Sequence, residues 1–174
     1  MSAKPIFFVC LLTIMSTVKA NTATLEKVKS ELTQVGKATF SFMFWDIYDS
    51  KLYTQSGRYS STSTQTLLLE IHYRKDITKD DLLANTVEQW QYLGFTKEKY
   101  DKYLDTLREL WPNIESGDSL SLLDDNKKSQ FYFNDEQLGT IEDAEFADLF
   151  LAIWLSEKTS QPILRKRLIG EKNE

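Results

Sequence analysis

Strict alternation of apolar and polar side chains is the feature that most limits the folds open to this chain. In one segment every second residue is apolar, at Ala38, Phe40, Phe42 and Phe44. In another, the apolar side chains of one parity are Leu67, Leu69, Ile71 and Tyr73. Because successive side chains of a strand point to opposite faces, this period predicts two β-strands, each with a buried face.

The apolar positions change phase directly after the first of these strands. Residues 45–48 read Trp-Asp-Ile-Tyr, with the apolar positions shifted by one, which indicates a bulge or a crossing into another environment. The polar triplet at 49–51 then predicts a turn, and Leu52 and Tyr53 open a return strand. A Ser/Thr-rich stretch over residues 55–65 reads as a long polar connection.

The second half of the chain carries helical spacing with clear start and stop signals. Thr78 and Gly94 bracket one expected helix, and Thr96 and Pro112 bracket the next. Short strands are expected over 119–123, 130–134 and 138–141, followed by helices from residue 142 and from residue 161. Residues 21–35 fit a helix or a loop leading into a strand. Strands followed by helices, without strict βαβ alternation, predict an α+β domain with a mainly antiparallel sheet.

The first twenty residues have the pattern of a secretory signal peptide. Lys4 precedes a ten-residue apolar stretch, and Val18 and Ala20 supply compact residues before a cleavage site between Ala20 and Asn21. The apolar stretch is too short for a permanent membrane anchor. The expected organisation is a signal peptide over 1–20, a lead segment over 21–36, one domain over 37–170 and a tail over 171–174. The mature protein is then expected to be periplasmic or secreted.

Charge and cysteine content remove several classes of function. The formal charge is −5, and it becomes more negative once Lys4 and Lys19 are removed with the leader. A nucleic-acid partner is therefore not expected, because such proteins neutralise phosphates with basic residues. The single cysteine, Cys10, lies in the leader, so the exported chain has no thiol for disulfides or metal binding.

The sequence contains no pattern of residues typical of a metal or cofactor site. The single histidine, His72, lies on the polar side of an alternating strand, without a second histidine or a short acidic ligand motif. The acidic residues between 135 and 148 lack calcium-loop spacing and are explained as turn and helix-start charges. No phosphate loop or nucleophile elbow is found. We therefore expect neither a metal nor a cofactor.

Aromatic residues on amphipathic elements are the remaining candidates for a site. They are Tyr48, Tyr53, Tyr73, Trp90, Tyr132 and Trp154. Aromatic walls with a few polar groups are typical of apolar ligand pockets, although ordinary core packing explains such residues equally well. Composition alone leaves both alternatives open.

Several motifs together give the chain a family resemblance. The late segments Phe131–Asn134, Leu138–Ile141, Phe150–Leu155 and Pro162–Gly170, with the earlier Phe44–Tyr53 and Leu69–Ile77, resemble the bacterial chalcone isomerase-like family in order and spacing. The resemblance covers roughly residues 35–170. It implies an α+β open-faced sandwich: a large, mainly antiparallel β-sheet with helices layered on one face and a cleft between them.

The resemblance also implies where catalytic residues would lie. Plant members of the family are isomerases that use a threonine, a tyrosine and an asparagine, and these positions fall at Met43, Leu82 and Gln89 here. An arginine and a late hydroxyl residue of those enzymes also lack a counterpart. Since a leucine neither orients water nor donates to a phenolate, isomerase activity is not expected and no catalytic residue is assigned.

Non-catalytic relatives bind fatty acids in the same cleft, so the leading hypothesis is an exported protein that binds a small lipophilic ligand, such as a fatty acid or a polyketide-like molecule. The candidate ligand-binding residues are Tyr48, Tyr53, Tyr73, Arg74, Leu82 and Trp90. The alternatives are a protein-interaction or scaffold module on the same fold, marked by a flat apolar patch, and an isomerase with a rebuilt site.

Overall fold

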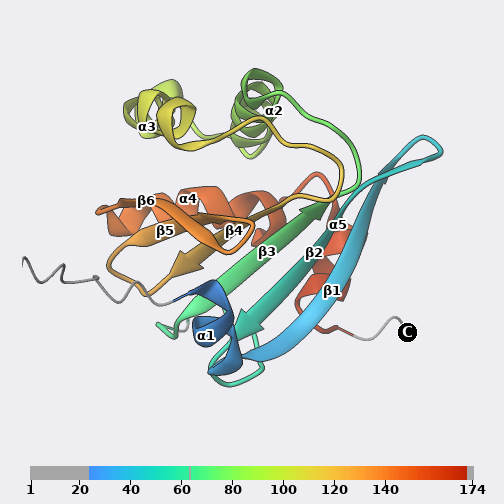
Figure 1. Cartoon of the computed structure of the whole chain (residues 1–174), viewed down its shortest axis with the longest axis vertical. Helices are drawn as coiled ribbons and strands as arrows, with labels where there is room; N and C mark the ends of the chain where they lie inside the picture. The colour runs from blue at the N-terminus through green and yellow to red at the C-terminus, as the bar shows by residue number, and fades with distance from the viewer. Residues whose placement is uncertain (1–23, 63, 172–174) are drawn as a thin grey trace, which may run out of the picture.

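The computed structural model describes residues 24–62 and 64–171, and it contains a six-stranded sheet with helices on both faces (Figure 1). The strands are β1 (Thr33–Phe42), β2 (Trp45–Thr54), β3 (Leu67–Tyr73), β4 (Ser119–Asp124), β5 (Ser129–Phe133) and β6 (Glu136–Ile141). The helices are α1 (Leu25–Ser30), α2 (Lys79–Tyr92), α3 (Lys97–Leu110), α4 (Ala144–Leu155) and α5 (Pro162–Leu168). The expected signal peptide lies outside the described residues.

The sheet is an antiparallel meander in which every strand pairs with its neighbours in sequence. The strand order is β1-β2-β3-β4-β5-β6, and α2 and α3 are inserted between β3 and β4. Helix α4 packs on β5, and α2 packs against both α3 and α4. The expected fold class, an open antiparallel sheet with helices packed on it, is confirmed, but the helices do not all lie on one face, because α1 packs on the other.

The first hairpin reverses at a different place from the one expected. Phe42 pairs with Trp45, so Met43 and Phe44 form a two-residue turn, and Met43 has a φ of 55°. The predicted turn at 49–51 is wrong, because β2 runs through these residues without interruption. The phase change after Phe44 therefore reflects chain reversal, with a bulge between Phe40 and Ser41.

The two faces of the sheet are covered by different elements. The alternation predicted in β3 is confirmed: Leu69, Ile71 and Tyr73 belong to the large core beneath the helices. Leu68 instead joins a small cluster on the opposite face, whose buried members are Leu25, Tyr53, Leu68, Leu123 and Tyr132. Since Leu25 comes from α1, this helix covers the second face (Figure 1).

Helix boundaries follow the predicted start and stop signals. The Thr78 Oγ1 accepts a hydrogen bond from the Asp81 amide at 3.1 Å, which caps α2, and Gly94 follows its end with a φ of 83°. Helix α5 packs along β1, where a side chain at Gly36 would overlap the backbone oxygens of Arg167 and Leu168. Gly36 is a strand residue without a side chain, which permits this close packing.

Candidate functional site

The main cavity lies between the covered face of the sheet and the overlying helices. Its volume is about 520 Å³, within the range of ~300–1,000 Å³ typical of small-molecule sites. Strands β1 to β5 contribute its floor, and α2, α4 and the residues before α5 contribute its walls. Most lining side chains are aliphatic or aromatic, and the aromatic ones include Phe40, Tyr48, Tyr73, Phe131, Phe150 and Trp154.

A hydrogen bond between a strand and a helix holds one wall of the cavity in place. The Trp154 Nε1 of α4 donates to the Tyr48 hydroxyl of β2 at 3.0 Å. The Tyr48 ring stacks on Phe40 with 5.2 Å between centroids and meets Tyr73 edge-on at 5.9 Å. Tyr48 and Tyr73 are register partners on adjacent strands, so both side chains lie on the same face of the sheet.

Both cavity tyrosines are neutral phenols at physiological pH. Burial raises the pKa of Tyr48 to about 12, and the hydrogen bond from Trp154 opposes this rise only in part. Burial also raises the pKa of Tyr73, and the neighbouring Tyr48 raises it further. Because neither phenol ionises near pH 7, each keeps an O–H group that donates a hydrogen bond.

The exposed lining residues mark the mouth of the cavity. Phe42 of the β1–β2 hairpin, Asn85 and Glu88 of α2, and Gln161 before α5 are all exposed and all line it. The opening therefore lies between the hairpin, α2 and the start of α5. Amide side chains at this opening supply both donors and acceptors to an entering ligand.

A hydrogen bond between two polar side chains crosses the rim of the cavity. The Ser160 Oγ donates to the Gln89 Oε1 at 2.6 Å, which joins the segment before α5 to α2. Thr86 also lines the cavity from α2, but its hydroxyl donates to the Leu82 carbonyl at 2.9 Å. The Gln89 amide nitrogen has no hydrogen-bond partner within residues 24–62 and 64–171, so it is available to a ligand.

Trp111 contributes an unpaired donor to the lining. The side chain is 2% exposed, and its buried Nε1–H has no hydrogen-bond partner in the described part of the chain. The ring contacts Phe131 and Phe150, with centroid separations of 5.6 and 6.0 Å. A buried donor without an acceptor carries a cost of roughly 1–3 kcal/mol.

The cavity is almost free of charge. Its lining contains no lysine, arginine or histidine among the described residues, and its only charged member is Glu88 at the mouth. No group of His, Cys, Asp or Glu side chains suited to a metal ion is found in residues 24–62 and 64–171. The lining therefore suits an apolar molecule with a few neutral polar groups.

Three of the candidate residues lie at this cavity. Tyr48, Tyr73 and Leu82 all line it, from β2, β3 and the first turn of α2. The structure therefore has a cavity between the sheet and α2, where the sequence hypothesis predicted a cleft. Whether these side chains bind a ligand is taken up below as a proposal.

The other three candidates lie elsewhere. Tyr53 packs beneath α1 on the opposite face of the sheet, with the Lys29 Nζ 5.4 Å from its ring centroid. Arg74 donates from Nε to the Asp49 Oδ2 at 2.8 Å and lines no part of the cavity. Tyr53 is five residues from Tyr48 in a continuous strand, so its side chain points to the opposite face of the sheet. Arg74 directly follows Tyr73, so it also points away from the cavity.

Trp90 belongs to the core behind α2. It is fully buried, stacks on Tyr100 at 5.3 Å, and donates from Nε1 to the Leu149 carbonyl of α4 at 2.9 Å. The side chain therefore fixes α2 on α4 and sets the height of the cavity roof without lining it.

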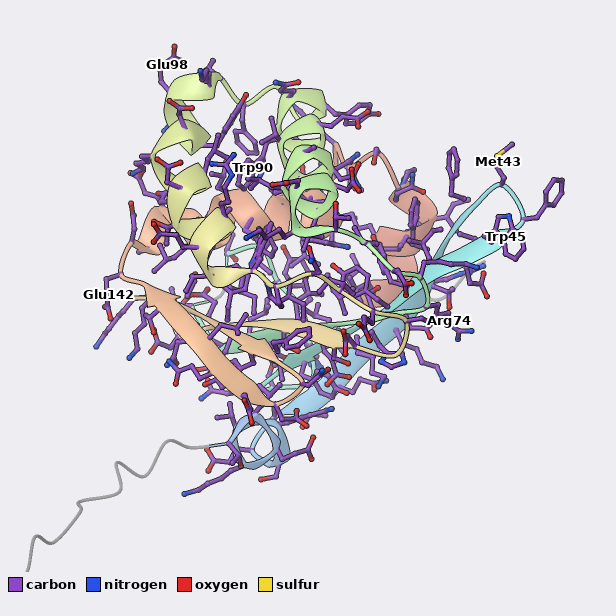
Figure 2. All side chains as sticks on the ribbon, turned by 45° about the horizontal axis from the view of Figure 1, so that its top comes forward. Met43, Trp45, Arg74, Trp90, Glu98 and Glu142 are labelled. Atoms are coloured by element: carbon purple, nitrogen blue, oxygen red, sulfur yellow. The ribbon has the colours of Figure 1, made fainter. Side chains whose placement is uncertain are left out.

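The positions aligned with plant catalytic residues are spread over the site and beyond it. Leu82 and Gln89 line the cavity, whereas Met43 projects from the hairpin tip (Figure 2). Met43 is 77% exposed, so its side chain lies in solvent. Neither a thioether nor a leucine side chain replaces a hydroxyl in orienting water or donating to an oxyanion.

Sequence reasoning missed the polar rim contributed by α2. Leu82, Asn85, Thr86 and Gln89 recur at a spacing of three or four residues, which places them along one face of the helix. This stripe of polar and apolar residues on one helix face is the sequence signal that could have indicated the rim. Trp111 and Phe150 also line the cavity, but nothing in sequence separates a side chain that packs against others from one that borders a void.

No helix within residues 24–62 and 64–171 has both the length and the apolar character needed to cross a bilayer.

Comparisons with known proteins show which family and which solved structure this chain resembles. The sequence profile described as chalcone isomerase-like matches residues 15–170. An uncharacterized protein of Haemophilus influenzae is 22% identical over 137 residues, which cover 79% of this chain and 67% of that protein. The crystal structure of the fatty-acid binding protein AtFAP1 of Arabidopsis thaliana superposes with a TM-score of 0.62 at 10% identity, covering 80% of this chain and 87% of the plant chain.

The structural match is too distant in sequence to show more than a shared fold. The profile match over residues 15–170 includes every described helix and strand, from α1 to α5. The chain therefore belongs to the chalcone isomerase-like family.

Proposed function

We propose that this protein binds one small lipophilic molecule in the cavity between the sheet and α2. The observation that carries the proposal is a mainly apolar cavity of about 520 Å³ that opens to solvent between the sheet and the helices. Protein interiors leave few voids larger than a water molecule, and each void lowers stability. A cavity of this size and lining is the usual form of a small-molecule site.

The comparison with the plant structure supports the same proposal. That protein is named a fatty-acid binding protein, and the superposed fold covers 80% of this chain. A shared fold is support by analogy, since one fold carries many functions. The proposal therefore depends on the cavity itself, with the plant protein as a guide to the ligand class.

The test is to recover the protein from its native cells and identify what it carries. Native mass spectrometry of the chain beginning at Asn21, followed by release of small molecules, is expected to show one lipophilic molecule per protein. Leu82→Trp fills the cavity from α2 and is expected to abolish the bound species. Ala84→Trp is the matched control, because Ala84 is exposed on the same helix and does not line the cavity. A folded parent protein without a bound molecule contradicts the proposal.

We also propose that the protein acts outside the cytoplasm, after cleavage between Ala20 and Asn21. The support is the charged start, apolar stretch and compact cleavage residues of the leader. Fractionation of cells expressing the full chain, with sequencing of the mature amino terminus, tests this. A cytoplasmic protein that retains residue 1 would contradict it.

The second candidate function is a protein-interaction module, and one observation favours it. Four consecutive apolar residues at the β1–β2 hairpin tip, Phe42, Met43, Phe44 and Trp45, are 62–96% exposed. The hairpin extends beyond the rest of the sheet (Figure 1). If this function holds, the native protein is recovered with a stoichiometric protein partner and an empty cavity, and Phe44→Ser releases that partner.

A further inference from the structure

The polar groups in the cavity floor are unusual in being donors that lack acceptors. The Tyr48 hydroxyl oxygen accepts from Trp154, but no hydrogen bond from its own O–H to an acceptor is found in the described residues. Tyr73 likewise lines the cavity, and no hydrogen bond of its hydroxyl is found in the described residues. Because buried polar groups are normally hydrogen-bonded, two hydroxyl donors without acceptors in one apolar cavity indicate the chemistry of its occupant.

Both donors are uncharged. Burial holds both phenols in their protonated form, as described above. A ligand that completes these hydrogen bonds must bring acceptor atoms, and it meets no positive charge in the floor. A carbonyl oxygen meets this requirement, since it has two lone pairs and no proton to place.

Ionised ligands are disfavoured by the same lining. No described lysine, arginine or histidine lines the cavity, so a carboxylate in the floor would be buried without a cationic partner. His72 and Arg74 do not line the cavity, and each bonds to a side chain outside it: Ser119 for His72, Asp49 for Arg74.

The mouth of the cavity also disfavours the binding of an anion. A ligand that left its carboxylate at the opening would bring it toward Glu88, the one charged lining residue, and like charges repel. Lys75 is near the hairpin, but its Nζ lies 4.2 Å from the Trp45 ring centroid, and it is not among the lining residues. The charge pattern therefore disfavours an anion both in the floor and at the rim.

We infer that the ligand is an uncharged lipophile that carries a carbonyl oxygen, such as an ester, a ketone, a lactone or a quinone, rather than a fatty-acid anion. The carbonyl accepts hydrogen bonds from the Tyr48 and Tyr73 hydroxyls, and the hydrocarbon part occupies the aromatic and aliphatic remainder of the cavity. This inference rests on the proposed function, since it names the ligand class of the same site. It differs from what the plant fatty-acid binding protein would suggest.

Three probes of matched chain length separate charge from hydrogen bonding. Methyl laurate carries a neutral carbonyl, laurate at pH 8 carries a carboxylate, and dodecane carries neither. Each competes with the neutral dye Nile red for the purified protein beginning at Asn21, in the same buffer. We expect methyl laurate to bind at least tenfold more tightly than either of the others.

Each outcome has a distinct meaning. Laurate that binds as tightly as the ester overturns the inference about charge, and dodecane that binds as tightly as the ester overturns the inference about the carbonyl. If none of the probes nor the dye binds, the proposed lipophilic function fails instead. The three results are distinguishable within one set of titrations.

Two variants connect the preference to the named donors. Tyr48→Phe and Tyr73→Phe keep the ring and remove the hydroxyl, so each is expected to weaken methyl laurate binding by about fivefold or more and to leave dodecane unchanged. Tyr132→Phe is the matched control, because Tyr132 is as buried as Tyr73 but lies beneath α1 on the opposite face. Equal effects of the variants on ester and alkane would mean that the tyrosines only shape the cavity.

Discussion

The Trp154 Nε1 donates to the Tyr48 hydroxyl at 3.0 Å and connects residues 106 positions apart in the sequence. This bond joins α4 to β2 at the edge of the cavity, where few other contacts cross. Replacing Trp154 with Phe removes the donor and part of the ring. The free energy of unfolding is expected to fall by about 1–3 kcal/mol, measured by chemical denaturation.

The same variant changes the titration of Tyr48. The indole hydrogen bond lowers the pKa of Tyr48 against the larger effect of burial, so its loss is expected to raise that pKa further. The ultraviolet absorbance of tyrosinate, followed with rising pH, reports the change. A lower pKa in Trp154→Phe would show that the variant opens the site to water instead.

Glu70 forms a buried ion pair that fastens α1 to the second face of the sheet. It accepts hydrogen bonds from Lys29 of α1 and from the Lys51 Nζ of β2, the latter at 2.9 Å. Burial acts to raise the pKa of Glu70, but these two lysines outweigh it, and the pKa is lowered overall. Glu70→Gln is expected to destabilise the protein at pH 7 by about 1–3 kcal/mol.

The effect of Glu70→Gln depends on pH in a defined direction. A carboxyl whose pKa is lower in the folded state contributes stability above its unfolded pKa of about 4.3, and this contribution is lost as pH falls through the folded value. The stability difference between parent and variant should therefore be constant above about pH 5 and shrink below pH 4. A difference that grows in acid would contradict this assignment.

Gly36 lets α5 lie directly on β1. A methyl group at this position would overlap the backbone oxygens of Arg167 and Leu168, and backbone atoms of a packed helix cannot rotate away. Gly36→Ala is expected to lower the free energy of unfolding by more than about 2 kcal/mol. Gly139→Ala is the matched comparison, because its methyl group would meet only the flexible Leu110 side chain, so its cost should be clearly smaller. Equal costs would show that α5 shifts freely.

Much of the fold follows from local patterns in the sequence. The alternation in β3 assigns Leu69 to one face and Leu68 to the other, and Thr78 marks the start of α2. These features depend on neighbours only a few residues apart, which a sequence displays directly. The antiparallel meander then follows from the order of strands and helices.

The candidate site was predicted only in part because it depends on long-range geometry. Met43 and Phe44 are not typical turn residues, so the reversal was placed at 49–51, and this error hid the odd spacing that separates Tyr48 from Tyr53. The unpaired Trp111 donor depends on which acceptors other segments bring near it. A void is likewise the result of packing between distant elements and has no local pattern.

The hairpin turn itself offers a prediction. Met43 has a positive φ of 55°, a conformation that favours glycine at the first position of a two-residue turn. Since the Met43 side chain is mostly exposed, little packing is lost on its removal, and Met43→Gly is expected to raise the free energy of unfolding by about 0.5–1 kcal/mol. Phe44→Gly is the control, because Phe44 has no such backbone requirement and should be neutral or destabilising. Thermal denaturation of the two variants distinguishes them.

If the absence of a cation sets the ligand preference, adding one should reverse it. Gln89 lines the mouth and is partly buried, so Gln89→Lys places an ammonium group within reach of a bound headgroup. We expect laurate binding, measured against methyl laurate, to strengthen by about five- to tenfold, because a partly exposed ion pair contributes roughly 1 kcal/mol. The gain should decline as salt is added, since ions screen the pair. Ala84→Lys adds the same charge to α2 outside the cavity; an equal gain there would trace the effect to net charge rather than to the site.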